Sequence, residues 1–229
     1  MPATTLTEIA DGLWGLEDEL SLPGGAKLPV RATVAALGDG GLAIYSPVAM
    51  AEQAAAAVAK LGRLQYVIAP SGLHHLYVAP TLAKFPEAKL YASPVVAKKR
   101  KGLRFDGVLT DGLPPGLAAV FSALTIEGAP AVQETVMVHN PTGSLLVTDL
   151  LFNITHPRGW MSKFVLGCTG TNGRLAQSRL WQFYGKDKAA LKTSTQKMLD
   201  LSWDRLIPCH GEVLATGAKN AVTAALRWK

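Results

Sequence analysis

Residues 145–153 read Leu-Leu-Val-Thr-Asp-Leu-Leu-Phe-Asn, and the run 144–148 that Asp149 closes has the length and composition of a buried strand. Histidines follow three other predicted strands. They are His74 and His75 after 64–69, His139 after 135–138, and His210 after 206–209. Because the strand ends of one sheet lie close together, we expect these side chains to converge at one edge.

Imidazole nitrogens combined with one carboxylate oxygen are the donors that suit a transition metal. The chain has five histidines, and all of them except His156 belong to these strand exits. Such a concentration favours a common site over chance. The sequence therefore predicts a metal site at one edge of the sheets.

Length and composition indicate one ordinary domain spanning residues 1–229. The hydrophobic share is 48% and the mean hydropathy is +0.19, which supports a large core and argues against disorder. The net charge of +6 attracts anionic ligands only weakly.

The chain gives no sign of a membrane or secretory segment. The Ala-rich stretch 54–59 is bracketed by polar residues, and the acidic N-terminal region lacks the basic and apolar parts of a signal peptide. The cysteines, Cys168 and Cys209, are too few for a disulfide scaffold. We therefore expect a cytoplasmic protein with no membrane partner.

Strands and helices alternate in a way that favours two packed sheets with helices outside over a simple doubly wound sheet. Strands are expected at 13–16, 30–37, 42–46, 64–69, 89–92, 124–127, 135–138, 144–149 and 205–209. Helices are expected at 50–61, from the histidine loop through 85, and at 94–101, 186–199 and 217–228. The stretch 152–179 is Gly-containing and is expected to be irregular.

Several of these stretches resemble the metallo-β-lactamase superfamily. Residues 67–69, a histidine-bearing loop, a helix and residues 85–93 together resemble the region of its His-x-His-x-Asp-His motif. Residues 145–153 are similar to its metal-bridging aspartate strand, and residues 209–212 to its last metal-binding histidine. The resemblance covers 9–228 and is nearest to a branch of proteins of unknown function. It implies a four-layer αββα sandwich, an α/β fold with its site at one edge of the two sheets.

Residue-by-residue comparison with the motif shows a departure. Counted back from residues 85 and 86, the four motif positions fall on Pro70, Gly72, His74 and His75. The first two histidines are absent, His74 stands at the aspartate position, and His75 is retained. The resemblance then implies a depleted first metal site, to which His139 would have belonged.

The second metal site of the superfamily is better preserved. Its implied ligands are His75, Asp149 and His210, with His74 in place of the missing carboxylate. The resemblance thus implies a single divalent metal ion, with zinc as the first choice and iron as the alternative. Asp149 and His139 are the candidate catalytic residues, and His156 is a further candidate for moving a proton.

The leading hypothesis is a metal-dependent hydrolase that acts on a small molecule, anionic substrates included. One alternative is a degenerate binding protein without catalysis, and another is an iron-dependent redox or thiol enzyme that uses Cys209. Nucleic-acid processing rests only on the basic run 98–101. That run lacks interleaved aromatic residues and is more typical of a solvated helix face.

Overall fold

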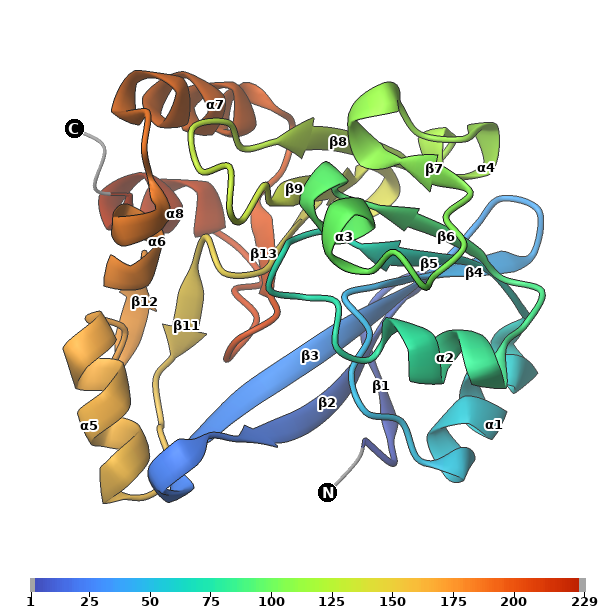
Figure 1. The fold of residues 1–229 in the computed structure, drawn as a ribbon, viewed down its shortest axis with the longest axis horizontal. Helices are drawn as coiled ribbons and strands as arrows, with labels where there is room; N and C mark the ends of the chain where they lie inside the picture. The colour runs from blue at the N-terminus through green and yellow to red at the C-terminus, as the bar shows by residue number, and fades with distance from the viewer. Residues whose placement is uncertain (1–2, 227–229) are drawn as a thin grey trace.

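Two β-sheets pack face to face in the computed structural model, which describes residues 3–226 (Figure 1). The first sheet has seven strands in sequence order: β1 (Leu6–Ala10), β2 (Leu13–Ser21), β3 (Lys27–Ala36), β4 (Gly41–Tyr45), β5 (Arg63–Ala69), β6 (Lys89–Ala92) and β7 (Gly107–Val108). The second has four strands in the order β13 (Arg205–Pro208), β10 (Ser144–Val147), β9 (Thr135–His139) and β8 (Phe121–Thr125). A separate ribbon pairs β11 (Phe152–Ile154) with β12 (Arg174–Ala176).

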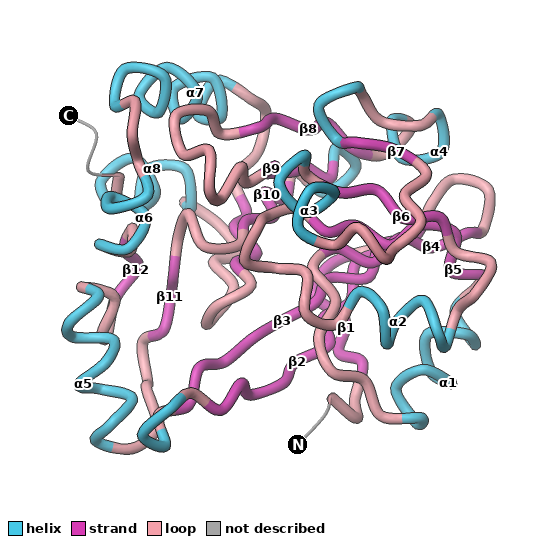
Figure 2. The backbone as a smooth tube through the Cα atoms, viewed as in Figure 1, coloured by secondary structure: helices cyan, strands magenta, loops and turns pink. Residues whose placement is uncertain are grey.

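Helices cover the outer faces of both sheets, as the tube drawing in Figure 2 shows. The first sheet is covered by α1 (Glu52–Leu61), α2 (Val78–Lys84) and α3 (Pro94–Lys99), and the second by α6 (Arg179–Tyr184), α7 (Lys188–Asp200) and α8 (Ala218–Ala225). The remaining helices are α4 (Pro115–Ala118) and α5 (Trp160–Thr169), with single 3-10 turns at Pro23–Gly25, Leu109–Asp111 and Asn140–Thr142. None of the helices in 3–226 is long and apolar enough to span a bilayer. The predicted four-layer αββα arrangement is confirmed.

Strand β10 shows why its sequence is a continuous apolar run. Leu145 and Val147 pack into the core under α7 and α8, whereas Leu146 packs into the core between the two sheets. Side chains alternate between the faces of a strand, so a strand covered on both faces must be apolar at every position. All four residues of β10 are buried.

Parallel pairing brings the ends of two strands of the second sheet side by side. β10 and β13 run parallel, and Val147 lies opposite Pro208 at their carboxyl ends. Asp149 and His210 each follow two residues later. β5 of the first sheet ends at Ala69, and its following loop is fixed to the second sheet because the Thr135 amide donates to the Pro70 carbonyl at 2.8 Å. Both sheets therefore deliver side chains to one edge.

The stretch 152–179 is not irregular, contrary to the prediction. It contains β11, α5 and β12. The two strands have three residues each, which is too short for a periodic signal. Glycines lie directly before and after α5, at 159 and 170. Glycine is typical of loops, so the sequence did not indicate a helix of only ten residues between them.

Other boundaries also differ from the expectation. The edge strand β1 was not predicted because its sequence, Leu-Thr-Glu-Ile-Ala, is short and half polar. β2 continues to Ser21 through a charged stretch because it pairs with β3 in a long hairpin. β8 begins at Phe121, earlier than expected, and the last helix ends at Ala225. The expected end of that helix, at 227–228, lies outside the described residues.

Removing apolar volume between the sheets is expected to destabilise the fold. Leu146→Ala should lower the unfolding free energy by about 2–5 kcal/mol, because the Leu146 side chain is fully buried and its removal leaves a cavity. Urea unfolding followed by circular dichroism measures the change. The matched control Leu76→Ala removes a side chain that is 54% exposed and should stay within about 0.5 kcal/mol of the parent. Equal losses would contradict this account of the core.

Candidate metal centre

Three side chains from different parts of the chain meet at the shared sheet edge. The Nε2 atom of His74 lies 3.1 Å from Oδ2 of Asp149 and 3.2 Å from Nε2 of His210. The Nε2 atom of His210 lies 3.5 Å from Oδ1 of Asp149. Around a tetrahedral zinc ion with bonds of about 2.1 Å, ligand atoms lie about 3.4 Å apart. The two imidazoles and the carboxylate thus lie close enough together to hold one ion.

The carboxylate of Asp149 supplies a test of that fit. Its Oδ2 atom is buried and lies 3.1 Å from Nε2 of His74, and His74 helps to lower the pKa of Asp149. A buried carboxylate oxygen needs a compensating positive charge, which a proton on His74 or a cation between the three groups would supply. The donor set of two imidazoles and one carboxylate is also one that catalytic zinc sites use.

The His210 ring is held so that Nε2 faces the cluster. Its Nδ1 atom lies 2.9 Å from the Pro29 carbonyl oxygen on β3, and because a carbonyl only accepts, Nδ1 must carry the proton. The Nε2 atom on the other side of the ring lies against His74 and Asp149. Phe152 stacks on the ring with a centroid distance of 4.5 Å and an interplanar angle of 10°. These contacts fix both the tautomer and the orientation.

Ser46 holds the ring of His74 in a similar way. Its Oγ atom lies 2.6 Å from Nδ1 of His74. Ser46 directly follows β4, is buried, and has φ of 56°, which is uncommon for a residue with a side chain. The backbone there is held because the Ser46 amide donates to the Ile68 carbonyl. A strained residue that is fixed by its surroundings and aimed at a polar cluster is typical of a functional site.

The charges of the three groups are strongly coupled. Burial alone would raise the pKa of Asp149, but His74 and His210 hold that pKa well below its usual range. Burial also disfavours the charged form of His74, yet Asp149 raises the His74 pKa well above its ordinary value. The cluster therefore favours a carboxylate with positive charge beside it, whether a proton or a metal ion supplies that charge.

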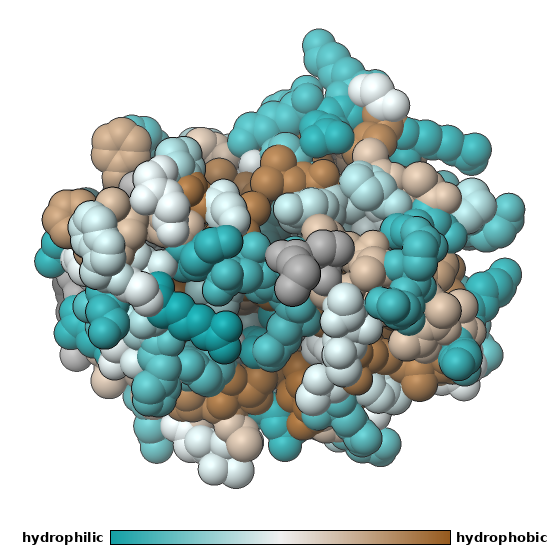
Figure 3. All heavy atoms as spheres, turned by 90° about the horizontal axis from the view of Figure 1, so that it is seen from below, coloured by the Kyte–Doolittle hydropathy of each residue, from teal (hydrophilic) through white to brown (hydrophobic). Residues whose placement is uncertain are grey.

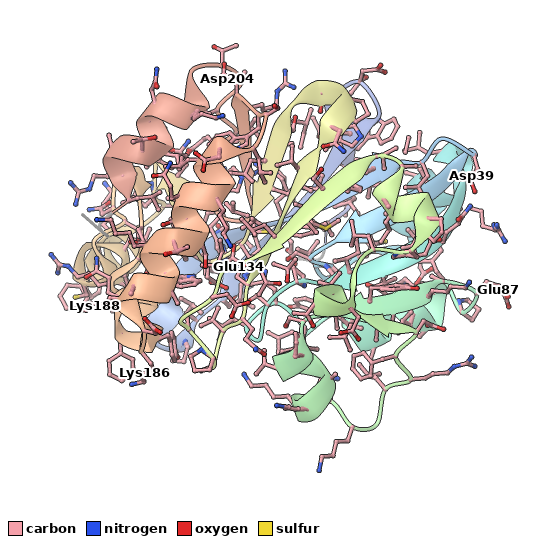
Figure 4. The ribbon with its side chains drawn as sticks, turned by 90° about the horizontal axis from the view of Figure 1, so that it is seen from above. Asp39, Glu87, Glu134, Lys186, Lys188 and Asp204 are labelled. Carbon is pink, nitrogen blue, oxygen red and sulfur yellow. The ribbon has the colours of Figure 1, made fainter. Side chains whose placement is uncertain are left out.

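Glu134 is a member of this region that the sequence analysis missed. Its carboxylate accepts the Thr148 amide at 2.6 Å and the Leu150 amide at 2.8 Å, so it binds the backbone on both sides of Asp149. Trp181 donates to it at 3.3 Å. Burial and the charge of Asp149 raise the Glu134 pKa to about 7. Figure 4 shows Glu134 in the interior, unlike the other labelled side chains.

An open cleft lies beside His210. It has a volume of about 600 Å³, and Pro29, Cys209 and Gly211 contribute to its lining. Charged residues of both signs surround it, with Lys27 and Arg158 among the cations. The cleft is lined by the sequence neighbours of His210, and His74, Asp149 and His210 are not among its lining residues.

Comparison with known proteins identifies the architecture. A family model described as "Domain of unknown function (DUF4336)" matches residues 10–96. Solved structures match nearly the whole chain. A metallo-β-lactamase from Pontibacter korlensis has a TM-score of 0.64 at 10% identity and covers 96% of this chain and 97% of its own. The chain has the metallo-β-lactamase fold.

Two further solved structures with this fold are a zinc-containing metallo-β-lactamase and a flavodiiron core. The metallo-β-lactamase FIM-1 from Pseudomonas aeruginosa, described in a mono-zinc form, has a TM-score of 0.60 at 14% identity and covers 99% of this chain and 98% of its own. The metal-soaked Flv1 flavodiiron core from Synechocystis has a TM-score of 0.67 at 11% identity and covers 98% of this chain and 60% of its own. No protein with a curated description matches the sequence.

Only one of the two adjacent histidines in the motif loop reaches the cluster. The structure places His74 there, whereas Nδ1 of His75 lies 3.4 Å from Nη1 of Arg100 on the far side of the loop. Burial together with Arg100 and Lys99 lowers the pKa of His75, so its ring favours the neutral form. The position that holds aspartate in the metallo-β-lactamase motif thus carries the converging imidazole.

His139 and His156 are not brought to the cluster. His139 pairs with Ser144 at the beginning of β10, at the opposite end from Asp149, and its Nδ1 atom lies 2.8 Å from the Thr142 hydroxyl. The His156 side chain is 91% exposed and lies near Thr155 and Glu212. Cys209 is buried and interacts with the His74 ring, but its sulfur is outside the group of three.

The buried position of His139 leads to a pH-dependent prediction. Burial lowers its pKa from 6.5 to about 4. The unfolded chain therefore binds more protons between these values, so the contribution of neutral His139 is present above pH 6.5 and is lost as the pH falls toward 4. The destabilisation caused by His139→Leu should be largest near pH 7 and should shrink on acidification. Urea unfolding at a series of pH values measures it. His156→Leu, at an exposed site, is the control, and a pH-independent cost of His139→Leu would contradict the prediction.

Proposed function

We propose that this chain is a metal-dependent hydrolase in which His74, Asp149 and His210 hold one divalent ion. The observation that carries the proposal is that the Nε2 atoms of His74 and His210 and the carboxylate of Asp149, which is largely shielded from solvent, lie within 3.5 Å of one another. Three protein ligands leave one position of a tetrahedral ion open for water or substrate, which is the arrangement of catalytic zinc sites.

Zinc fits the donor set best, and iron is the alternative. Zinc favours two imidazoles with one carboxylate at the observed spacing. The mono-zinc form described for the Pseudomonas aeruginosa structure supports a single ion in this fold. The similarity to a flavodiiron core keeps iron in consideration.

The chain's own residues would orient and shield the site. When bound, the ion would lower the pKa of a water molecule toward neutrality and polarise a carbonyl or phosphoryl oxygen of the substrate. Pro29 and Ser46 keep the Nε2 atoms of His210 and His74 directed at the proposed position of the ion. Phe152 limits rotation of the His210 ring. Glu134 fixes the backbone around Asp149 and so holds the carboxylate in place.

The neighbouring cleft is the proposed binding space for a small-molecule substrate. Its lining carries Lys27, Arg31 and Arg158 together with Glu17, Asp18, Glu19 and Glu212, so the screen should include neutral as well as anionic substrates. Screens with esters, lactones and phosphodiesters cover the bonds that such a centre hydrolyses.

The first test is metal content. Untagged protein analysed by inductively coupled plasma mass spectrometry should contain about one zinc or iron ion per chain. Asp149→Ala and His210→Ala should lose it, because each removes one of the three proposed ligands. Hydrolysis of any substrate found in the screen should be lost in parallel.

His74 and His75 provide a matched pair for the same measurement. His74→Ala should lose the ion, and His75→Ala should retain it because its ring faces Arg100. Loss of metal in His75→Ala with retention in His74→Ala would contradict the proposed ligand set. Wild-type protein that binds no metal after reconstitution would favour a binding protein without catalysis.

The hydroxyl of Ser46 gives a second prediction. Ser46→Ala should weaken metal binding by about tenfold to a hundredfold, because the hydrogen bond that orients His74 is removed. Competition with a chelator of known affinity measures the change. Ser46→Gly also lacks the hydroxyl but tolerates the positive φ. Both variants should therefore weaken binding, and Ser122→Ala, at an exposed hydrogen bond, should not. Full affinity in Ser46→Gly would show that backbone strain, and not the hydrogen bond, matters at this position.

A further inference from the structure

The part of the chain between Asp149 and Asp187 contains no acidic residue. Its basic residues are all exposed and are Arg158, Lys163, Arg174, Arg179 and Lys186. This segment, 150–186, forms β11, α5, β12 and α6 and lies along one side of the molecule (Figure 1). Much of the excess positive charge of the chain is therefore concentrated in one surface region.

The same segment carries the most exposed large hydrophobic side chains among the described residues. Trp160 is 75% exposed, Phe164 is 63% exposed and Phe183 is 71% exposed. Trp160 and Phe164 lie one turn apart and share a face of α5. Aromatic side chains of this size are seldom left in water without a partner.

The opposite face of α5 is fixed to the protein. Ser162 and Leu166 are buried, and the Ser162 hydroxyl accepts the Lys27 amide of β3 at 2.8 Å. At the other end of the helix, Arg179 of α6 donates to the Cys168 carbonyl at 3.3 Å. The aromatic face is thus turned outward by packing on both sides. Figure 3 views the face with the hairpin tip and α5 and shows hydrophobic residues among hydrophilic ones.

Cations accompany the exposed aromatic residues in the sequence, and one of them lies over an aromatic ring. Lys163 lies between Trp160 and Phe164 in the sequence of α5, and the Lys186 ammonium lies 5.3 Å from the ring centroid of Phe183. Aromatic rings combined with Lys and Arg on one side of a surface helix are typical of elements that lie in the interface of an anionic membrane. The rings enter the headgroup region, and the cations remain at the level of the phosphates.

We propose that the segment 150–186 docks the protein onto the surface of an anionic lipid bilayer. Charge favours lipid over a second copy of the chain, because two copies meeting through this face would place like charges together. The segment itself carries five cations and no acidic residue, and Glu19 of the neighbouring hairpin, which lies beside Arg158 and Trp160, is paired with Lys27 at 3.6 Å. The docking does not require a metal ion, so vesicle binding can be measured separately from metal content, although Arg158 also lines the cleft proposed for the substrate.

Sedimentation with vesicles tests the proposal. The protein should bind vesicles made of equal parts phosphatidylcholine and phosphatidylglycerol and should not bind pure phosphatidylcholine vesicles. Trp160→Ala combined with Phe164→Ala should reduce binding by about tenfold or more, because two rings no longer enter the interface. Arg158→Glu combined with Lys163→Glu should reduce it at least as strongly, and added salt should weaken it.

Two control double variants distinguish docking through the segment 150–186 from non-specific attraction of the whole protein to the vesicles. Leu73→Ala with Leu76→Ala removes exposed hydrophobic side chains elsewhere, and Lys98→Glu with Lys101→Glu reverses exposed cations on and beside α3. Both should bind vesicles like the parent. The blue shift of tryptophan fluorescence on binding should be reduced in Trp160→Phe, which reports the position of that ring directly.

Three results would overturn the proposal. The first is no binding to anionic vesicles, and the second is equal loss of binding in the matched variants. The third is a different occupant for the face. A dimer that disappears on Trp160→Ala with Phe164→Ala would assign the face to a second copy of the chain. A single-stranded oligonucleotide bound with the same dependence on these residues would assign it to nucleic acid.

Discussion

The cluster of His74, Asp149 and His210 depends on the carboxylate of Asp149, which is largely shielded from solvent. Asp149 lies between the rings of His74 and His210 at the end of a strand that is apolar on both faces. A buried carboxylate is costly unless positive charge and hydrogen bonds compensate it. Both sheets contribute to that compensation, since β13 leads to His210 and the loop after β5 leads to His74. The three groups of the proposed metal centre therefore meet at the edge that the two sheets share.

Support for the two imidazoles comes from strands of the first sheet. Pro29 on β3 binds His210, and Ser46 after β4 binds His74. The hairpin that carries Pro29 is itself fixed to α5 through Ser162. The proposed membrane-facing helix and the orientation of His210 thus share one element. A contact that shifted the hairpin would move Pro29 and, through its hydrogen bond with His210, would change the proposed metal centre.

The direction of each strand explains how much of the site could be predicted from the sequence. Asp149 and His210 follow strands that run parallel to each other, so their convergence could be inferred from strand ends alone. β9 runs antiparallel to β10, and its last residue, His139, therefore lies at the opposite edge. The residue before β9, Glu134, lies at the correct edge for the same reason. The fold class was predictable from the apolar runs and the resemblance. Strand direction and the orientation of neighbouring loop residues such as His74 and His75 require the packed structure.

Packing also explains why a second metal site would not fit in the motif loop. The Gly72 amide donates to the Val132 carbonyl at 2.7 Å, and a Cβ atom at position 72 would lie 2.7 Å from the Ala131 carbonyl oxygen. A histidine there would require the backbone of 131–132 to move. The close backbone contact occupies the space that a side chain of the first metal site would need. Backbone hydrogen bonds from Gly72 to Val132 and from Thr135 to Pro70 fix this loop against the segment that leads into the second sheet, and His74 follows directly in the chain.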